Sequence, residues 1–127
     1  MVQVLLIAFA GALGTLARYG VGLWAGRVLG TTFPYGTLIV NIVGCFLIAV
    51  VSQLALSTTY ISPSMRLTLN TGFMGGLTTY SSFNFETTNL LRERGLAEGL
   101  SNLGITMTSC FVAGLLGMVV ARKLAAL

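Results

Sequence analysis

One amide and a short run of hydroxyl and aromatic side chains are the groups of this sequence best suited to hold a small anion. The run is TTYSSF, from Thr78 to Phe83, and Asn41 stands in an otherwise apolar segment. Amides and hydroxyls donate hydrogen bonds without a fixed charge, and the edge of an aromatic ring is partly positive. A site built from such groups binds an anion weakly enough to release it, which is what conduction requires.

Helical spacing would place several of these side chains on one stripe. Tyr80, Phe83 and Glu86 stand at positions i, i+3 and i+6, and Thr79 lies four residues before Phe83. Because residues three or four apart are neighbours on a helix surface, the aromatic edges and the hydroxyl are predicted to face one path.

A second set of polar residues has the same spacing near the end of the chain. Asn102, Thr106 and Cys110 follow one another at intervals of four. Together with Asn41, these polar groups either line a path for the anion or form hydrogen bonds that hold helices together in lipid. Both interpretations remain open from the sequence.

The composition predicts an all-α membrane protein. Of 127 residues, 55% are hydrophobic and only 8% are charged, and the mean hydropathy is +0.90. Soluble domains are usually about one quarter charged. The basic residues are dispersed and form no cluster of the kind that binds nucleic acid. With no histidine and no plausible catalytic set, the chain is not expected to be an enzyme.

Four apolar segments are each long enough to cross a hydrocarbon core of about 30 Å. They form one transmembrane domain over residues 1–127. The predicted spans are residues 2–24, 34–56, 65–91 and 96–120. Trp24, Tyr35 and Tyr60 fall near their boundaries, where interfacial aromatic residues are common.

The third span is expected to be broken near its middle. Gly75 and Gly76 weaken a helix there, and the hydroxyls of Thr78 and Thr79 can satisfy the backbone groups that a break releases. The alternative is a kinked helix in which the glycines only allow close packing.

The basic residues give little preference for one orientation. Arg66, Arg122 and Lys123 lie on the side that holds both termini, whereas Arg27, Arg92 and Arg94 lie on the other side. Because loop charge sets orientation, such a chain could insert both ways and form an antiparallel homodimer, the inverted repeat of a transporter built from separate chains. Alternatively, features outside this count select one orientation.

The two cysteines give no clear sign of a site. Cys45 and Cys110 both lie within apolar runs. Two small buried side chains are expected, in preference to a disulfide or a metal-binding pair.

Three segments, taken in order, resemble the Fluc family of bacterial fluoride channels, also called CrcB proteins, over nearly the whole chain. They are GALGTLARYG in the first span, PYGTLIVNIVGCF in the second and GFMGGLTTYSSFNFET in the third. The resemblance implies a multi-pass protein of the bacterial inner membrane, in contact with the lipid bilayer, that exports fluoride passively and confers fluoride resistance.

The resemblance also implies an assembly and a set of functional residues. The assembly is a dual-topology antiparallel homodimer with two pores and a structural sodium ion on its axis, held by the carbonyls of Gly75 and Thr78. Asn41 would donate to fluoride, and the rings of Tyr80 and Phe83 would turn their edges toward it. The other pathway residues are Thr79, Ser81, Asn102 and Thr106 along the path, with Arg18 and Glu86 toward its ends.

The chain departs from the family pattern at one position. TTYSSF stands where the family has TTFSTF, so that Tyr80 replaces a phenylalanine. The added hydroxyl bears on the rate of conduction more than on the fold.

A rival hypothesis is a small multidrug exporter, which is also a dual-topology protein of four spans. Coupling protons to cationic drugs would need an acidic residue deep in the first span, and the first span here has none.

Overall fold

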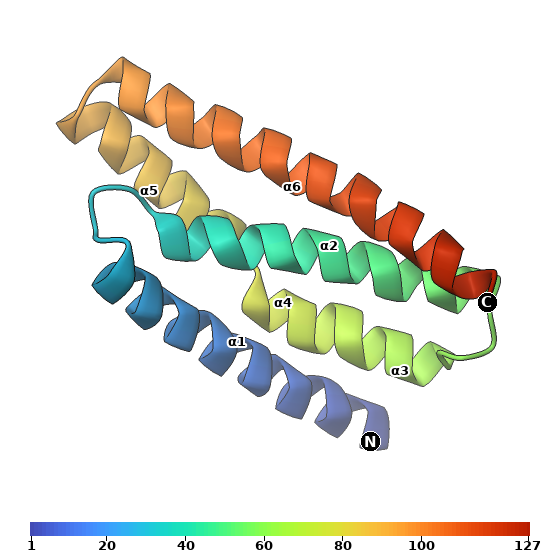
Figure 1. Cartoon of the computed structure of the whole chain (residues 1–127). Helices are drawn as coiled ribbons and strands as arrows, with labels where there is room; N and C mark the ends of the chain where they lie inside the picture. The colour runs from blue at the N-terminus through green and yellow to red at the C-terminus, as the bar shows by residue number, and fades with distance from the viewer.

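The computed structural model describes residues 1–127, and every regular element in it is helical. The elements in chain order are α1 (Val2–Val28), α2 (Tyr35–Ser57), α3 (Pro63–Leu67), the π-helical segment η1 (Thr68–Met74), α4 (Gly75–Leu77), α5 (Tyr80–Glu93) and α6 (Leu96–Ala125). They form an elongated bundle in which both termini lie at the same end (Figure 1).

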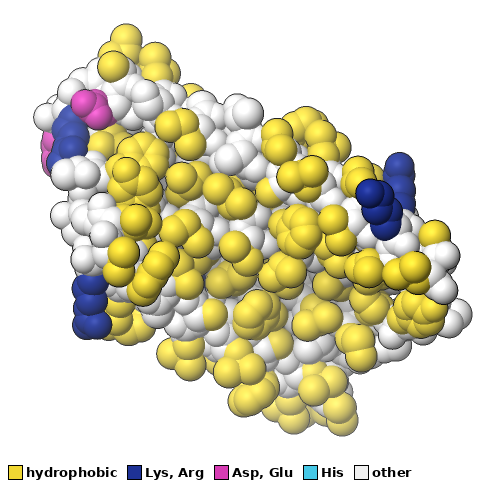
Figure 2. Space-filling model, in the orientation of Figure 1, with side chains coloured by type: hydrophobic (Ala, Val, Ile, Leu, Met, Phe, Trp, Pro, Cys, Tyr) yellow, Lys and Arg dark blue, Asp and Glu magenta, His cyan; other side chains and the backbone are white.

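Three of the helices, α1, α2 and α6, are long and apolar enough to cross a membrane. Their outward surfaces carry many exposed leucine, valine and phenylalanine side chains. On the face shown in Figure 2, hydrophobic side chains cover the middle and the charged ones gather at the two ends. The protein is therefore a multi-pass membrane protein whose apolar surface meets lipid.

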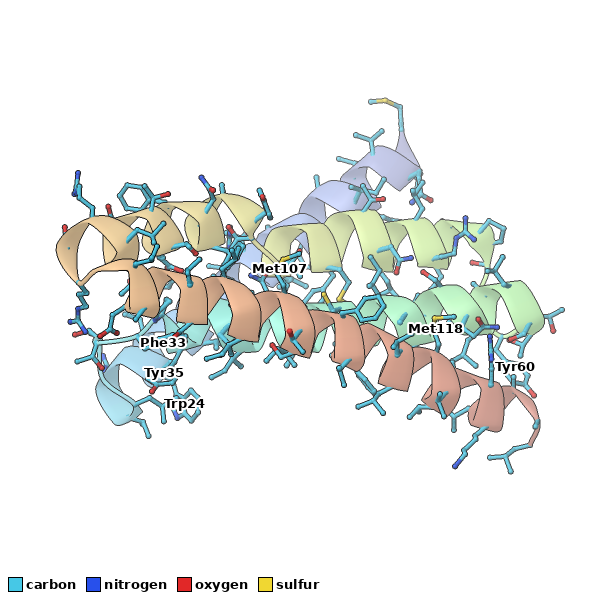
Figure 3. All side chains as sticks on the ribbon, turned by 90° about the horizontal axis from the view of Figure 1, so that it is seen from above. Trp24, Phe33, Tyr35, Tyr60, Met107 and Met118 are labelled. Carbon is cyan, nitrogen blue, oxygen red and sulfur yellow. The ribbon has the colours of Figure 1, made fainter.

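Aromatic side chains mark the two ends of this apolar zone. Trp24 and Tyr35 lie at one end of the bundle and Tyr60 lies at the other (Figure 3). Amphipathic rings at both ends are typical of the membrane–water interfaces.

The third predicted span is interrupted, but not at its glycines. Gly75 has helical backbone angles, and the helix continues to Leu77. Thr78 and Thr79 are extended, with φ/ψ of −84°/157° and −152°/109°, before α5 begins at Tyr80. We call Thr78–Thr79 the helix break. The predicted interruption near the middle of the third span is present, but the two glycines expected to cause it remain helical.

The glycines before the break serve close packing against α1. A Cβ on Gly76 would lie 3.0 Å from the amide nitrogen of Thr15, and one on Gly14 would lie 2.9 Å from that of Leu77. Only glycine allows this approach of two backbones, so the half-helix before the break is held against α1. The core cluster Val40, Met74 and Leu77 packs beside this contact.

Candidate functional site

Asn41 of α2 pairs with the backbone of the helix break. Its Oδ1 accepts from the Thr79 amide at 2.8 Å, and its Nδ2 donates to the Thr79 carbonyl at 3.1 Å. Both residues are buried. Asn41 thus satisfies the two backbone groups that the helices on either side of Thr79 leave without a partner, which would otherwise be costly in a membrane interior.

The contacts at the helix break remove the usual hydrogen-bond donors of the Gly75 and Thr78 carbonyls. In a continuous helix the Thr79 amide would donate to Gly75 and the Ser82 amide to Thr78. Here the Thr79 amide donates to Asn41, and the Ser82 amide donates to the Thr79 hydroxyl at 3.2 Å. The carbonyls of Gly75 and Thr78 are therefore released from their usual helical donors, and carbonyl oxygens are good ligands for a hard cation.

The two aromatic residues of the predicted stripe lie side by side after the break. The ring centroids of Tyr80 and Phe83 are 5.8 Å apart and their planes are tilted by 59°. Phe83 is buried, whereas Tyr80 is 75% exposed and projects from the chain. In a tilted pair of this kind the two ring faces are not stacked flat on each other. The ring edges are the partly positive parts of the rings.

A cavity of about 340 Å³ brings many of the predicted residues together. It is lined by Asn41, Thr79, Tyr80, Phe83 and Thr106, and also by Gly75 and Thr78. No charged side chain lines it. The arrangement offers amide, hydroxyl and ring-edge groups to an anion without a fixed cation that would trap it.

Asn102 lies outside this cavity and holds α6 to α5. Its side chain is 1% exposed, and its Nδ2 donates to the Thr87 hydroxyl at 2.8 Å. The Thr87 hydroxyl donates in turn to the Phe83 carbonyl, and Thr106 donates to Asn102 at 3.4 Å. A chain of polar groups thus continues from the cavity along α5 and α6. Thr87 was not predicted from the sequence, although it lies four residues after Phe83.

Glu86 contacts α2 farther along α5. Its Oε1 accepts a hydrogen bond of 2.8 Å from Thr37, and the two residues line a polar cavity at the end of the bundle near Phe33 and Arg94. Thr37 was also missed, and its position four residues before Asn41 on α2 was the available signal.

Arg18 and Ser81 both lie outside the cavity that contains Asn41 and Phe83. Arg18 lines a third cavity with Thr37, Thr79 and Ser82, so that Thr79 borders both this cavity and the one that holds Phe83. Ser81 is exposed, and its hydroxyl lies 3.4 Å from that of Thr79. Thr79 is therefore the residue that connects the arginine to the aromatic pair.

The two cysteines are less buried than the sequence predicted. Cys45 and Cys110 are free thiols, and both are partly exposed. Each lines the cavity that contains Asn41 and Phe83. The expectation of two buried side chains was wrong, because an apolar run of sequence does not show which face of its helix borders a cavity.

Comparisons with known proteins agree on one family. The family model described as CrcB-like protein, Camphor Resistance (CrcB), matches residues 5–118. A protein of Sorangium cellulosum named fluoride-specific ion channel FluC is 52% identical over 94% of both chains. Proteins of the same name are 41% identical in Citrifermentans bemidjiense and 44% identical in Rhizobium johnstonii, each over 98% of this chain and all of the relative.

Proposed function

The chain belongs to the CrcB-like family, and from that membership we propose that it is a fluoride-selective passive channel. It exports fluoride across the bacterial inner membrane and so protects the cell from fluoride. The observation that carries the proposal is the uncharged cavity in which Asn41, Thr79 and Phe83 converge. The protein performs no chemical reaction; it lowers the barrier to crossing the membrane.

Asn41 supplies a donor to the passing ion. Its Nδ2 carries two hydrogens, and one of them is used on the Thr79 carbonyl. The other is available to fluoride, and because the amide is fixed on both sides by Thr79, little ordering is needed when the ion arrives. Fluoride is small and accepts hydrogen bonds strongly, so compact donors favour it over the larger chloride.

Along the path, charged side chains stand only away from the central cavity that contains Asn41. Arg18 attracts anions at the third cavity, and the Thr79 hydroxyl leads from there to the rings of Tyr80 and Phe83. Ser81, Asn102 and Thr106 continue the polar surface, and Glu86 stands near one end, hydrogen-bonded to Thr37. The positive charge of Arg18 favours entry of the anion, and the absence of charge in the central cavity favours its rapid release.

The working unit is an antiparallel dual-topology homodimer with two pores. The broken third segment supplies a fourth crossing as two half-helices, α3–α4 and α5. Tyr80 and Phe85 are largely exposed in the single chain, and both follow the helix break. A second copy would complete the wall of the cavity beside Tyr80. The equal numbers of basic residues on the two sides support insertion in both orientations.

A structural sodium ion suits the carbonyls of Gly75 and Thr78. Both are released from their helical donors by the contacts of Asn41 and Thr79, and two chains related by a two-fold axis would supply four such oxygens. When bound, the ion would supply positive charge that neutralises these carbonyl dipoles and fixes the two breaks together.

The rival proton-coupled multidrug exporter is not favoured. Its cation site would need a buried acid in α1, and this helix contains no aspartate or glutamate. No acidic side chain lines the central cavity either.

Efflux from liposomes tests the proposal. Vesicles that hold the purified protein and either potassium fluoride or potassium chloride are diluted into a buffer that contains neither of these anions. Valinomycin then allows potassium to leave with the anion. We expect rapid fluoride efflux and chloride efflux at the level of protein-free vesicles. Equal rates for the two anions would contradict a selective channel, and uphill fluoride movement driven by a proton gradient would show a coupled transporter instead.

A further inference from the structure

Sulfur side chains gather in the central cavity. The chain has two cysteines and five methionines. Four of these seven side chains, Cys45, Met74, Met107 and Cys110, line the same cavity of about 340 Å³. Met107 lies near the middle of the bundle in Figure 3, far from its ends. The clustering brings together side chains from α2, η1 and α6.

The two thiols come from α2 and α6, which pack against each other beside the cavity. Cys45 is on α2 and Cys110 is on α6, and both line the same cavity of about 340 Å³. One turn beyond Cys110, the backbones approach so closely that a Cβ on Gly114 would lie 3.9 Å from the Cys45 carbonyl oxygen. This packing holds the two helices that carry the thiols beside one cavity.

The other groups of the cavity decide which ligand such a pair would take. No carboxylate and no histidine lines it, so the usual zinc sites lack ligands there. Thiolates and thioethers are soft donors that select soft metal ions. We propose that Cys45 and Cys110 form a two-coordinate binding site for a soft, thiophilic metal ion, assisted by the thioether of Met107.

Charge balance favours a divalent ion. Mercuric chloride forms one bond from mercury to each sulfur and releases its two chlorides, while both thiols lose their protons to water, so the product is a neutral bis-thiolate together with two protons and two chloride ions. No oxidant is required. A neutral complex avoids the cost of placing net charge within the membrane.

The bound metal would obstruct the cavity shared with Asn41 and Phe83. A soft cation at this point is therefore expected to block anion passage reversibly. The block rests on the proposed channel function, whereas the binding of the metal does not, so the two are measured separately.

Metal retention tests the binding. The purified protein receives one equivalent of mercuric chloride and then excess 2-mercaptoethanol, and bound mercury is measured by native mass spectrometry. We expect one mercury per chain with a mass that shows the loss of two protons. Because two linked donors act at a high effective concentration, Cys45→Ser or Cys110→Ser should weaken retention on the order of 100-fold. Met107→Leu should weaken it less, and Met118→Leu, outside the cavity, should have no effect.

Equal retention by the parent protein and both single-cysteine variants would overturn the proposal, as would a Cys45–Cys110 disulfide that forms in air and leaves no thiols. Fluoride efflux provides the second measurement. The parent protein should lose flux on mercury addition and recover it with excess dithiothreitol, while Cys45→Ala and Cys110→Ala, each compared with its own flux before addition, should resist mercury at concentrations that block the parent. Retention without block would refute the placement of the pair on the ion path.

Discussion

The side chain of Asn41 and the backbone of Thr79 form two hydrogen bonds, of 2.8 and 3.1 Å, across the helix break. Asn41 therefore satisfies the backbone amide and carbonyl of Thr79 and keeps one N–H, which the proposed function assigns to fluoride. The sequence alone left open whether this residue contacts the anion or joins two helices. The geometry allows both, because a primary amide has two donors and one oxygen.

Replacing this amide by a carboxylate should abolish conduction. In Asn41→Asp the donor to the Thr79 carbonyl disappears and an acceptor faces it, so the fold should lose about 1–3 kcal/mol. The negative charge should also repel fluoride and lower liposome flux at least a hundredfold, roughly 3 kcal/mol in the barrier. Asn84→Asp, the same change at an exposed position of α5, serves as the control. Normal flux through Asn41→Asp would show that the residue is only structural.

Removal of the hydroxyl from Tyr80 should increase flux. The ring edge remains in Tyr80→Phe, and the tilted contact with Phe83 does not require the hydroxyl. A hydroxyl beside the path holds or obstructs the ion, and about 1 kcal/mol corresponds to roughly a fivefold change in rate. Side-by-side efflux at matched protein density measures it, with Tyr60→Phe at the end of the bundle as control. A Tyr80→Phe variant no faster than the parent would place Tyr80 off the path.

A methyl group on Gly76 should destabilise the half-helix before the break. Its Cβ would lie 3.0 Å from the Thr15 amide nitrogen and still closer to the Gly11 carbonyl. Overpacking of this kind costs about 1–3 kcal/mol. Gly20→Ala, where nothing lies within 4 Å, should be neutral or slightly stabilising. Thermal unfolding in detergent compares the two, and equal melting temperatures would mean that α1 does not pack on α4 in solution.

Dual insertion should be visible from the C-terminus. A reporter fused after Leu127 should appear on both faces of the membrane. Because cytoplasmic loops collect basic residues, the double substitution Arg92→Gln and Arg94→Gln should shift the C-terminus toward the cytoplasm. Glu93→Gln in the same region is the control, since acidic residues contribute little to orientation. A parent protein with every C-terminus on one face would exclude the antiparallel dimer.

Removal of sodium should lower stability without changing the anion preference of any remaining flux. If the Gly75 and Thr78 carbonyls hold the ion, replacing sodium by N-methyl-D-glucamine should lower the melting temperature, since a ligand bound only by the folded state stabilises it. Restored sodium should reverse the loss at a concentration set by its affinity, whereas potassium at equal ionic strength should not. A melting temperature that is the same in both buffers would argue against a sodium site.

The sequence by itself determined the class of the protein and the association of two aromatic residues. Long apolar segments must become helices in a membrane because no water is present to satisfy the backbone, and the TTYSSF run marked the third segment as different. Helical spacing was sufficient to associate Tyr80 with Phe83, and they do form a pair. The same spacing rule could have identified Thr37 and Thr87.

Only the tertiary structure decided where the break lies and which side chains share a cavity. Gly75 and Gly76 resemble helix breakers in sequence, yet they remain helical because α1 packs on them. The break falls instead at Thr78–Thr79, where Asn41 from another helix takes over the Thr79 backbone bonds. Likewise, Cys45 and Cys110 line one cavity because α2 packs on α6. Contacts between distant segments fix these features, and local sequence carries no record of the partner's position.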